Sequence, residues 1–166
     1  MHKSVGECSL LNWAALFVYG QSISRMVCYQ SLSLDELQVL IVESDPDSRY
    51  LLTLFLEEYG VEMIVATSTD EAIKILKQLK LDLLISEIRL PKEDGYSLMH
   101  KVQALELQGQ VQIPAIALTV CAREDDRANA LSVGFEKHLP KPFDIDELIE
   151  TVATLTLTKQ VQSVLA

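Results

Sequence analysis

The amino-acid sequence predicts an α/β protein in which five helices cover both faces of a five-stranded, doubly wound parallel sheet. Two observations support this fold class. Short apolar runs alternate with stretches of helical periodicity, and the connections between them are short. The runs are nearly continuous rather than alternating, which is typical of parallel strands buried on both faces. The five predicted strands are Gln38–Val42, Val61–Ala66, Asp82–Ser86, Pro114–Thr119 and Phe135–Leu139.

Helix start and stop signals separate these strands. Asp45 followed by Pro46 is a helix cap with proline in the first turn, and Gly60 ends that helix. Ser68 with Glu71 forms a capping box for the second helix. Asp94-Gly95 marks the turn before the third, which ends in a polar loop at 108–110. The fourth covers about 123–133, and Asp144 or Asp146 caps the fifth.

Size and charge limit the possible functions. The chain has 166 residues, enough for one domain with a sizeable core. The net charge of -10 argues against binding to nucleic acid or an anionic membrane, because both require basic side chains. Three cysteines without metal-site spacing suggest neither a disulfide framework nor a zinc site. We therefore expect a cytoplasmic protein.

The sequence divides into an N-terminal extension (1–36), one domain (37–157) and a C-terminal tail (158–166). The apolar run Leu10–Tyr19 is too short to span a membrane and lacks the flanks of a secretion signal. Met26 is a later candidate start. No effector domain follows Ala166, so we expect a stand-alone module whose output is protein binding.

Acidic residues follow two of the predicted strands. Glu43 and Ser44 come after the first, and Glu87 ends the central one. Thr119 closes the fourth strand and Lys141 follows the fifth. Carboxyl ends of parallel strands share one edge of a sheet, so these groups can meet there and serve a hard cation and a phosphoryl oxygen. Alternatively, the acids only cap the following helices and Lys141 pairs with one of them.

Four segments, VLIVESDPDSR, DLLISEIRLPKEDGYSL, IPAIALTV and GFEKHLPKPF, resemble the receiver domain of two-component response regulators. The resemblance covers about 37–157 and implies a flavodoxin-like fold. By position it implies that Glu87 stands at the phosphoacceptor site and that Thr119 and Lys141 contact the phosphoryl group. It places Glu43, Ser44, Glu87 and the carbonyl of Arg89 at a Mg²⁺ site, and His138 at the position of the switch aromatic residue.

Two positions depart from the family pattern. Glu87 replaces an aspartate, which moves the carboxylate by one methylene in a site that must align its reacting atoms. Ser44 replaces one acid of the metal-binding pair, so we expect Mg²⁺ to bind weakly or not at all. Both changes favour a receiver that keeps the fold but has lost the phosphoryl chemistry.

The leading hypothesis is a non-phosphorylated or phosphomimetic binding module without enzymatic activity. Glu87 either imitates the phosphorylated state by reaching Thr119 and Lys141, or locks the domain off. The resemblance implies a protein partner, namely a histidine kinase, phosphotransfer protein or effector, or a second copy in a homodimer. It also implies a contact surface that includes Arg127, Ala130, Leu131, Glu136, His138 and Pro140.

Two alternatives stay open. One is a conventional phosphoacceptor that uses Glu87, or the neighbouring Ser86. The other is a metal-dependent phosphohydrolase that uses Asp45 and Asp47, although these acids are better explained as a helix cap and a first-turn charge.

Overall fold

The computed structural model describes residues 34–109, 112–120 and 123–165. Its centre is one parallel sheet with the strand order β2-β1-β3-β4-β5. The predicted fold class is confirmed. The strands are β1 (Gln38–Val42), β2 (Glu62–Ala66), β3 (Leu83–Glu87), β4 (Ala115–Thr119) and β5 (Lys137–Pro140).

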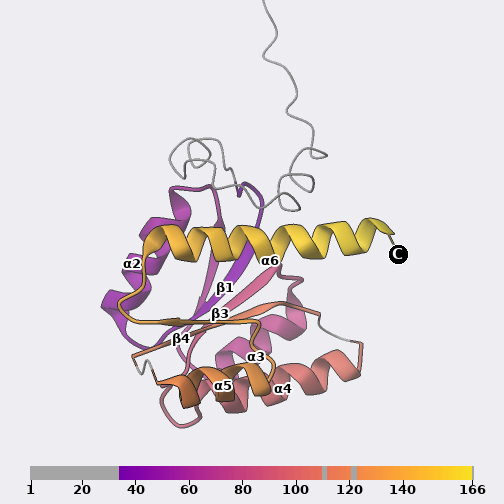
Figure 1. Cartoon of the computed structure of the whole chain (residues 1–166). Coiled ribbons are helices and arrows are strands. Elements are labelled where there is room, and N and C mark those ends of the chain that lie inside the picture. Colours follow the sequence, from indigo (N-terminus) through magenta and orange to yellow (C-terminus); the bar gives the residue numbers. More distant parts are fainter. Residues whose placement is uncertain (1–33, 110–111, 121–122, 166) are drawn as a thin grey trace, which may run out of the picture. The chain divides into compact units, whose positions relative to one another are not determined.

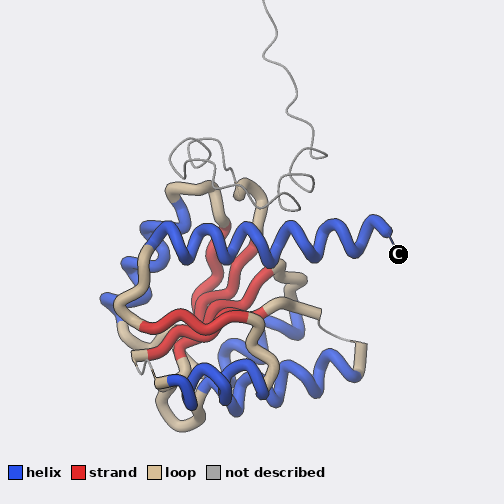
Figure 2. Tube along the Cα trace, viewed as in Figure 1, coloured by secondary structure: helices blue, strands red, loops and turns tan. Residues whose placement is uncertain are grey.

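Helices cover both faces of this sheet. In Figure 1, α2 and α6 lie on one side of the strands, and α3, α4 and α5 lie on the other. Figure 2 shows the strands as the middle layer between these two groups. The helices are α2 (Pro46–Glu57), α3 (Thr69–Gln78), α4 (Gly95–Leu107), α5 (Glu124–Ser132) and α6 (Ile145–Leu165).

The predicted helix starts are visible as hydrogen bonds. The Asp45 side chain accepts from the Ser48 N–H at 2.8 Å, and the Asp94 side chain accepts from the Ser97 N–H at 2.8 Å. Before α6, the Asp144 carboxylate accepts from the Asp146 N–H at 2.8 Å, so Asp144 rather than Asp146 is the cap. These side chains satisfy backbone donors that the first turn of a helix leaves unpaired.

Successive strand residues pack into opposite layers. Leu40, Val42 and Leu84 belong to one buried cluster, together with side chains of α3, α4 and α5. Their neighbours Ile41 and Ile85 are fully buried too but lie outside that cluster. Because side chains alternate along a strand, the sheet has a core on each face, as the unbroken apolar runs predict.

Several boundaries differ from those expected. β5 begins at Lys137, because the Phe135 N–H bonds to the Ala130 carbonyl at the end of α5. α6 continues to Leu165, past the predicted domain end at 157. Leu34 is buried and its N–H bonds to the Tyr59 carbonyl, so it packs with the domain although it was assigned to the extension.

Within the described residues, no helix is both long and apolar enough to cross a membrane. The apolar run Leu10–Tyr19, the alternative start Met26 and all three cysteines lie outside the described residues.

Candidate functional site

The carboxyl edge of the sheet brings the predicted site residues together. Glu43 follows β1, Glu87 is the last residue of β3 and Thr119 the last of β4. Lys141 follows β5 and donates its backbone N–H to the Thr119 carbonyl at 2.6 Å. This bond fixes the start of the Lys141 side chain beside the central strands.

Lys141 connects the two glutamates. Its Nζ lies 2.5 Å from Glu43 Oε2 and 2.7 Å from Glu87 Oε2. Glu43 and Lys141 are 98 positions apart in the chain. One ammonium group therefore neutralises carboxylates from two neighbouring strands.

Backbone donors hold the other carboxylate oxygens. The Asp45 N–H donates to Glu43 Oε1 at 2.9 Å, and the Arg89 N–H donates to Glu87 Oε1 at 3.0 Å. All four oxygens of the two carboxylates thus have a hydrogen-bond donor. Hydrogen bonds of this kind reduce the cost of burying charge.

The cluster is shielded from water. The side chains of Glu43, Glu87 and Lys141 are 2%, 6% and 17% exposed. Burial lowers the pKa of Lys141, but its hydrogen bonds to Glu43 and Glu87 and their negative charges outweigh burial and raise the pKa above 10.5. Lys141 therefore stays charged at neutral pH, where it forms ion pairs with both Glu43 and Glu87.

Two residues that the sequence reasoning missed support this cluster. The Arg49 Nη1 donates to the carbonyls of Glu43 and Ser44 at 2.9 and 3.3 Å and holds the turn after β1. Gly95 lies against β3, where a Cβ atom would come within 2.7 Å of the Glu87 carbonyl oxygen. Asp94-Gly95 was noted as a turn signal, but no local pattern marks this close approach or the role of Arg49.

The remaining site residues lie at the same edge. Thr119 is buried, Ser44 is half-buried, and Arg89 contributes its backbone N–H to Glu87. Ser86 is fully buried with its hydroxyl donated to the Glu87 carbonyl, which leaves it inaccessible to a phosphoryl donor. Asp45 is exposed and caps α2. A helix cap is the explanation of Asp45 that the sequence favours over a role in a phosphohydrolase site.

The arrangement does not fit a bound Mg²⁺ ion as it stands. Magnesium binds carboxylate oxygens, and each oxygen of Glu43 and Glu87 already accepts one hydrogen bond, which leaves a single lone pair on each. The ammonium of Lys141 also lies between the two acids and would repel a dication. The described residues contain no group of three or more His, Cys, Asp or Glu side chains that could hold a metal.

A pocket of about 380 Å³ lies at the edge of the sheet that β5 forms and is lined by residues of α5, β5 and α6. Five of the six predicted contact-surface residues line it: Arg127, Leu131, Glu136, His138 and Pro140. The assignment of the sixth residue, Ala130, to this surface is wrong because its side chain is fully buried in the core. Exposure could not be read from helical periodicity there, since α5 has few apolar residues to mark its inner face.

His138 is one of the residues that line this pocket. Its Nε2 is buried without a hydrogen-bond partner among the described residues. Burial lowers the pKa of His138 below 6.5, the nearby Asp126 carboxylate raises it and the Arg127 guanidinium lowers it, with burial dominant. The ring is therefore neutral at pH 7.

Comparison with known proteins places this geometry in a family. The family model for the response regulator receiver domain matches residues 39–153. An uncharacterized 14.6 kDa protein in the sodA1 3' region of Leptolyngbya boryana is 42% identical over 72% of this chain and 90% of that protein. A probable transcriptional regulator, ycf29 of Cyanophora paradoxa, is 32% identical over 68% of this chain but only 53% of its own length.

Solved structures agree. A two-component response regulator from Clostridium difficile has a TM-score of 0.65 and 29% identity, covering 72% of this chain and 95% of its own. The receiver domain of the sensor histidine kinase PA1611 from Pseudomonas aeruginosa PAO1, solved with magnesium in its active-site cleft, has a TM-score of 0.66 and 28% identity over 72% of this chain and 97% of its own. This chain therefore belongs to the response regulator receiver domain family.

Proposed function

We propose that this protein is a receiver of two-component signalling that does not carry phosphate and acts as a protein-binding module. Family membership supports the signalling role, and receiver domains are in general signalling modules rather than enzymes. The observation that carries the finer proposal is the 2.7 Å contact between Glu87 and Lys141. The acceptor-position carboxylate already neutralises the lysine that would otherwise contact a phosphoryl group.

The geometry of Glu87 argues against phosphoryl transfer. A nucleophilic oxygen must lie near 3 Å from phosphorus and in line with the leaving group. In Glu87, one oxygen accepts from the Arg89 N–H and the other from Lys141. Attack would have to use a carboxylate whose negative charge is already balanced by Lys141, in a site that is largely shielded from water.

The Mg²⁺ binding that we expect to be weak supports the same conclusion. Phosphoryl transfer depends on metal ions and positive side chains to neutralise developing charge. Here Ser44 supplies no carboxylate, and Glu43 is paired with Lys141. A metal ion would have to displace this ammonium group before it could bind both acids.

Relatives suggest the kind of partner. PA1611 is a sensor histidine kinase and ycf29 a probable transcriptional regulator, so related domains occur in both types of protein. We propose that this protein binds a histidine kinase, phosphotransfer protein or effector in the same way, through a surface that Glu87 keeps in one state.

The test is phosphorylation by acetyl phosphate with Mg²⁺, read by intact mass spectrometry. The wild-type protein should gain no phosphoryl group. The double variant Glu87→Asp with Ser44→Asp should gain one, and only with Mg²⁺ present, because it restores the acceptor's reach and a second metal-binding acid while Thr119 and Lys141 are kept.

Two controls make this test specific. Glu62→Asp with Ser132→Asp makes the same chemical changes at exposed positions away from the site and should stay unmodified. Adding Lys141→Ala to the restored variant should abolish uptake. A phosphoryl group on wild-type Glu87 would overturn the proposal in favour of a conventional phosphoacceptor, and an inert double variant would refute the two-residue explanation.

A further inference from the structure

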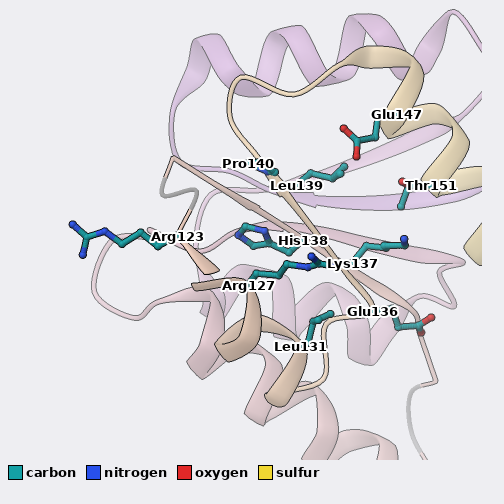
Figure 3. Close-up of a pocket in the computed structure, with 10 residues that line it drawn as sticks. All are labelled: Arg123, Arg127, Leu131, Glu136, Lys137, His138, Leu139, Pro140, Glu147 and Thr151. Carbon is teal, nitrogen blue, oxygen red and sulfur yellow. The ribbon is translucent and has the colours of Figure 1, made fainter. Parts of the chain in front are cut away.

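The pocket along β5 has walls of different chemistry. Arg127 and Leu131 of α5 lie on one side of the strand, and Glu147 and Thr151 of α6 lie on the other (Figure 3). His138, Leu139 and Pro140 of β5 also line the pocket. β5 is an edge strand, so no further strand of the sheet covers this side.

The α5 wall is basic with an apolar end. Arg127 and Leu131 lie four positions apart in α5 and so share one helix face, and Arg123 is the residue just before that helix. Leu131 is 42% exposed, which makes it an accessible apolar contact beside the two guanidinium groups. Lys137, on β5, adds a third cation.

The three cations at this pocket are not paired with acidic side chains among the described residues. Arg123, Arg127 and Lys137 make no ion pair or side-chain hydrogen bond with any residue in the described part of the chain. Lys101 and Lys141, in contrast, are both paired with carboxylates. Three unpaired cations around one pocket stand out in a protein of net charge -10.

The acids at this pocket do not neutralise the α5 wall. Glu136 points away from His138 and Arg127 in Figure 3, and it has an interaction of its own. Glu147 stands on the opposite α6 wall and forms no ion pair with the described cations. Asp125 and Asp126 are not among the residues that line the pocket.

We propose that this pocket binds an acidic segment of a partner protein that places an apolar side chain on Leu131 and carboxylates on Arg127 and Lys137. The inference rests on the proposed binding function and names the chemistry of the partner. Guanidinium groups bind carboxylates through paired hydrogen bonds, and exposed leucine beside them adds apolar contact area.

The lining also argues against a small-molecule ligand. Such ligands bind in concave sites lined mainly by apolar side chains that bury most of the ligand surface. Most residues around this pocket are polar or charged, and the cations are exposed. A peptide segment that lies along the edge of the sheet can use these groups without being enclosed.

The experiment selects peptides from an unbiased library displayed on phage, using the full-length wild-type protein as bait. Enriched peptides should carry aspartate or glutamate next to leucine or another large apolar residue. Fluorescence polarisation of the most enriched peptide should show at least about tenfold weaker binding to Arg127→Glu with Lys137→Glu, a loss expected when two ion pairs become repulsive.

Matched variants separate the effect of the charges at the pocket from the effect of the protein's total charge. Lys77→Glu with Lys80→Glu makes the same charge change at exposed positions around the end of α3 and should bind like the wild type. Glu147→Gln should bind equally or more tightly, since it removes a negative charge facing the ligand. Added salt should weaken binding to the wild type.

Clear results would overturn the inference. Selection of basic or purely apolar peptides would exclude a pocket that prefers acidic segments. An equal loss of affinity in both double-charge variants would also exclude it. Tighter binding by Arg127→Glu with Lys137→Glu would mean that the pocket prefers basic segments. Phosphorylation of Glu87 is a separate mass measurement. Failure of the proposed function would therefore appear there, whereas failure of the pocket would appear only in peptide binding.

Discussion

At the scale of single residues, the site depends on one ammonium group shared by two buried acids. Lys141 contacts Glu43 and Glu87 within 2.7 Å, and neither acid has another charged partner in an ion pair among the described residues. Replacing a buried ion pair as a whole is often tolerated, but removing one member leaves uncompensated charge. Lys141 is therefore the residue whose loss should cost most at this edge.

We expect Lys141→Met to lower the free energy of unfolding at pH 7 by about 3 kcal/mol, because two buried carboxylates lose their counter-ion. Urea unfolding measures this change. The control is Lys101→Met, which breaks an exposed ion pair with Glu93 and should cost much less. Equal losses in the two variants would contradict a special role for the buried cluster.

The same lysine predicts a pH dependence. The pKa of Lys141 is raised in the folded protein because its bonds to Glu43 and Glu87 outweigh burial. Its contribution is then fully present below pH 10.5 and is lost as the pH rises through the folded-state pKa. The stability difference between wild type and Lys141→Met should shrink in that alkaline range, and a constant difference would argue against the ion cluster.

At the scale of elements, the loop from β3 to α4 positions Glu87. The Gly95 N–H donates to the Ile88 carbonyl at 2.8 Å, so the first residue of α4 lies directly on the end of β3. A Cβ atom there would also come within 3.0 Å of Ile88 Cα. The helix can start at this point only because residue 95 has no side chain.

Gly95→Ala should destabilise the protein by about 1–3 kcal/mol, since the added methyl group pushes β3 and α4 apart. A double-mutant cycle with Lys141→Met should be non-additive, because both changes act on Glu87. Gly109→Ala is the control: its φ of +69° makes alanine strained, but open space surrounds it. That variant should be additive with Lys141→Met, and additivity at both glycines would disprove the coupling.

At the scale of the whole molecule, Ser33–Ala166 form one compact unit. Its buried residues begin at Leu34, which is 5% exposed, and continue through both faces of the sheet. Each strand of the sheet supplies side chains to this core, so the unit should unfold as a single cooperative domain.

Deleting residues 1–29 should therefore leave the cooperativity and midpoint of thermal unfolding unchanged. Deleting 1–36 removes Leu34 as well and should lower the free energy of unfolding by about 2 kcal/mol, the value of one buried leucine. Circular dichroism during heating distinguishes the two. Loss of cooperative unfolding in the shorter deletion would mean that the first 29 residues contribute to the core.

The amino-acid sequence by itself determined the fold class, the carboxyl ends of β1, β2 and β4, and the capping residues of α2 and α3. These features depend on local apolar runs and turn residues, which act over a few positions. Glu43, Glu87, Thr119 and Lys141 could be assigned to one edge because parallel strands must align their carboxyl ends. Their chemical roles follow from family resemblance and stay predictions.

Only the tertiary structure decided how these groups pair. Lys141 could have bonded to one acid or to none, and its contact with both depends on the sheet order that puts β1 beside β3 and on the bond from its N–H to Thr119. The burial of Ala130 and the close approach of Gly95 to Glu87 also depend on packing between distant segments. Local sequence patterns do not predict such contacts, because these contacts form only when the whole chain has folded.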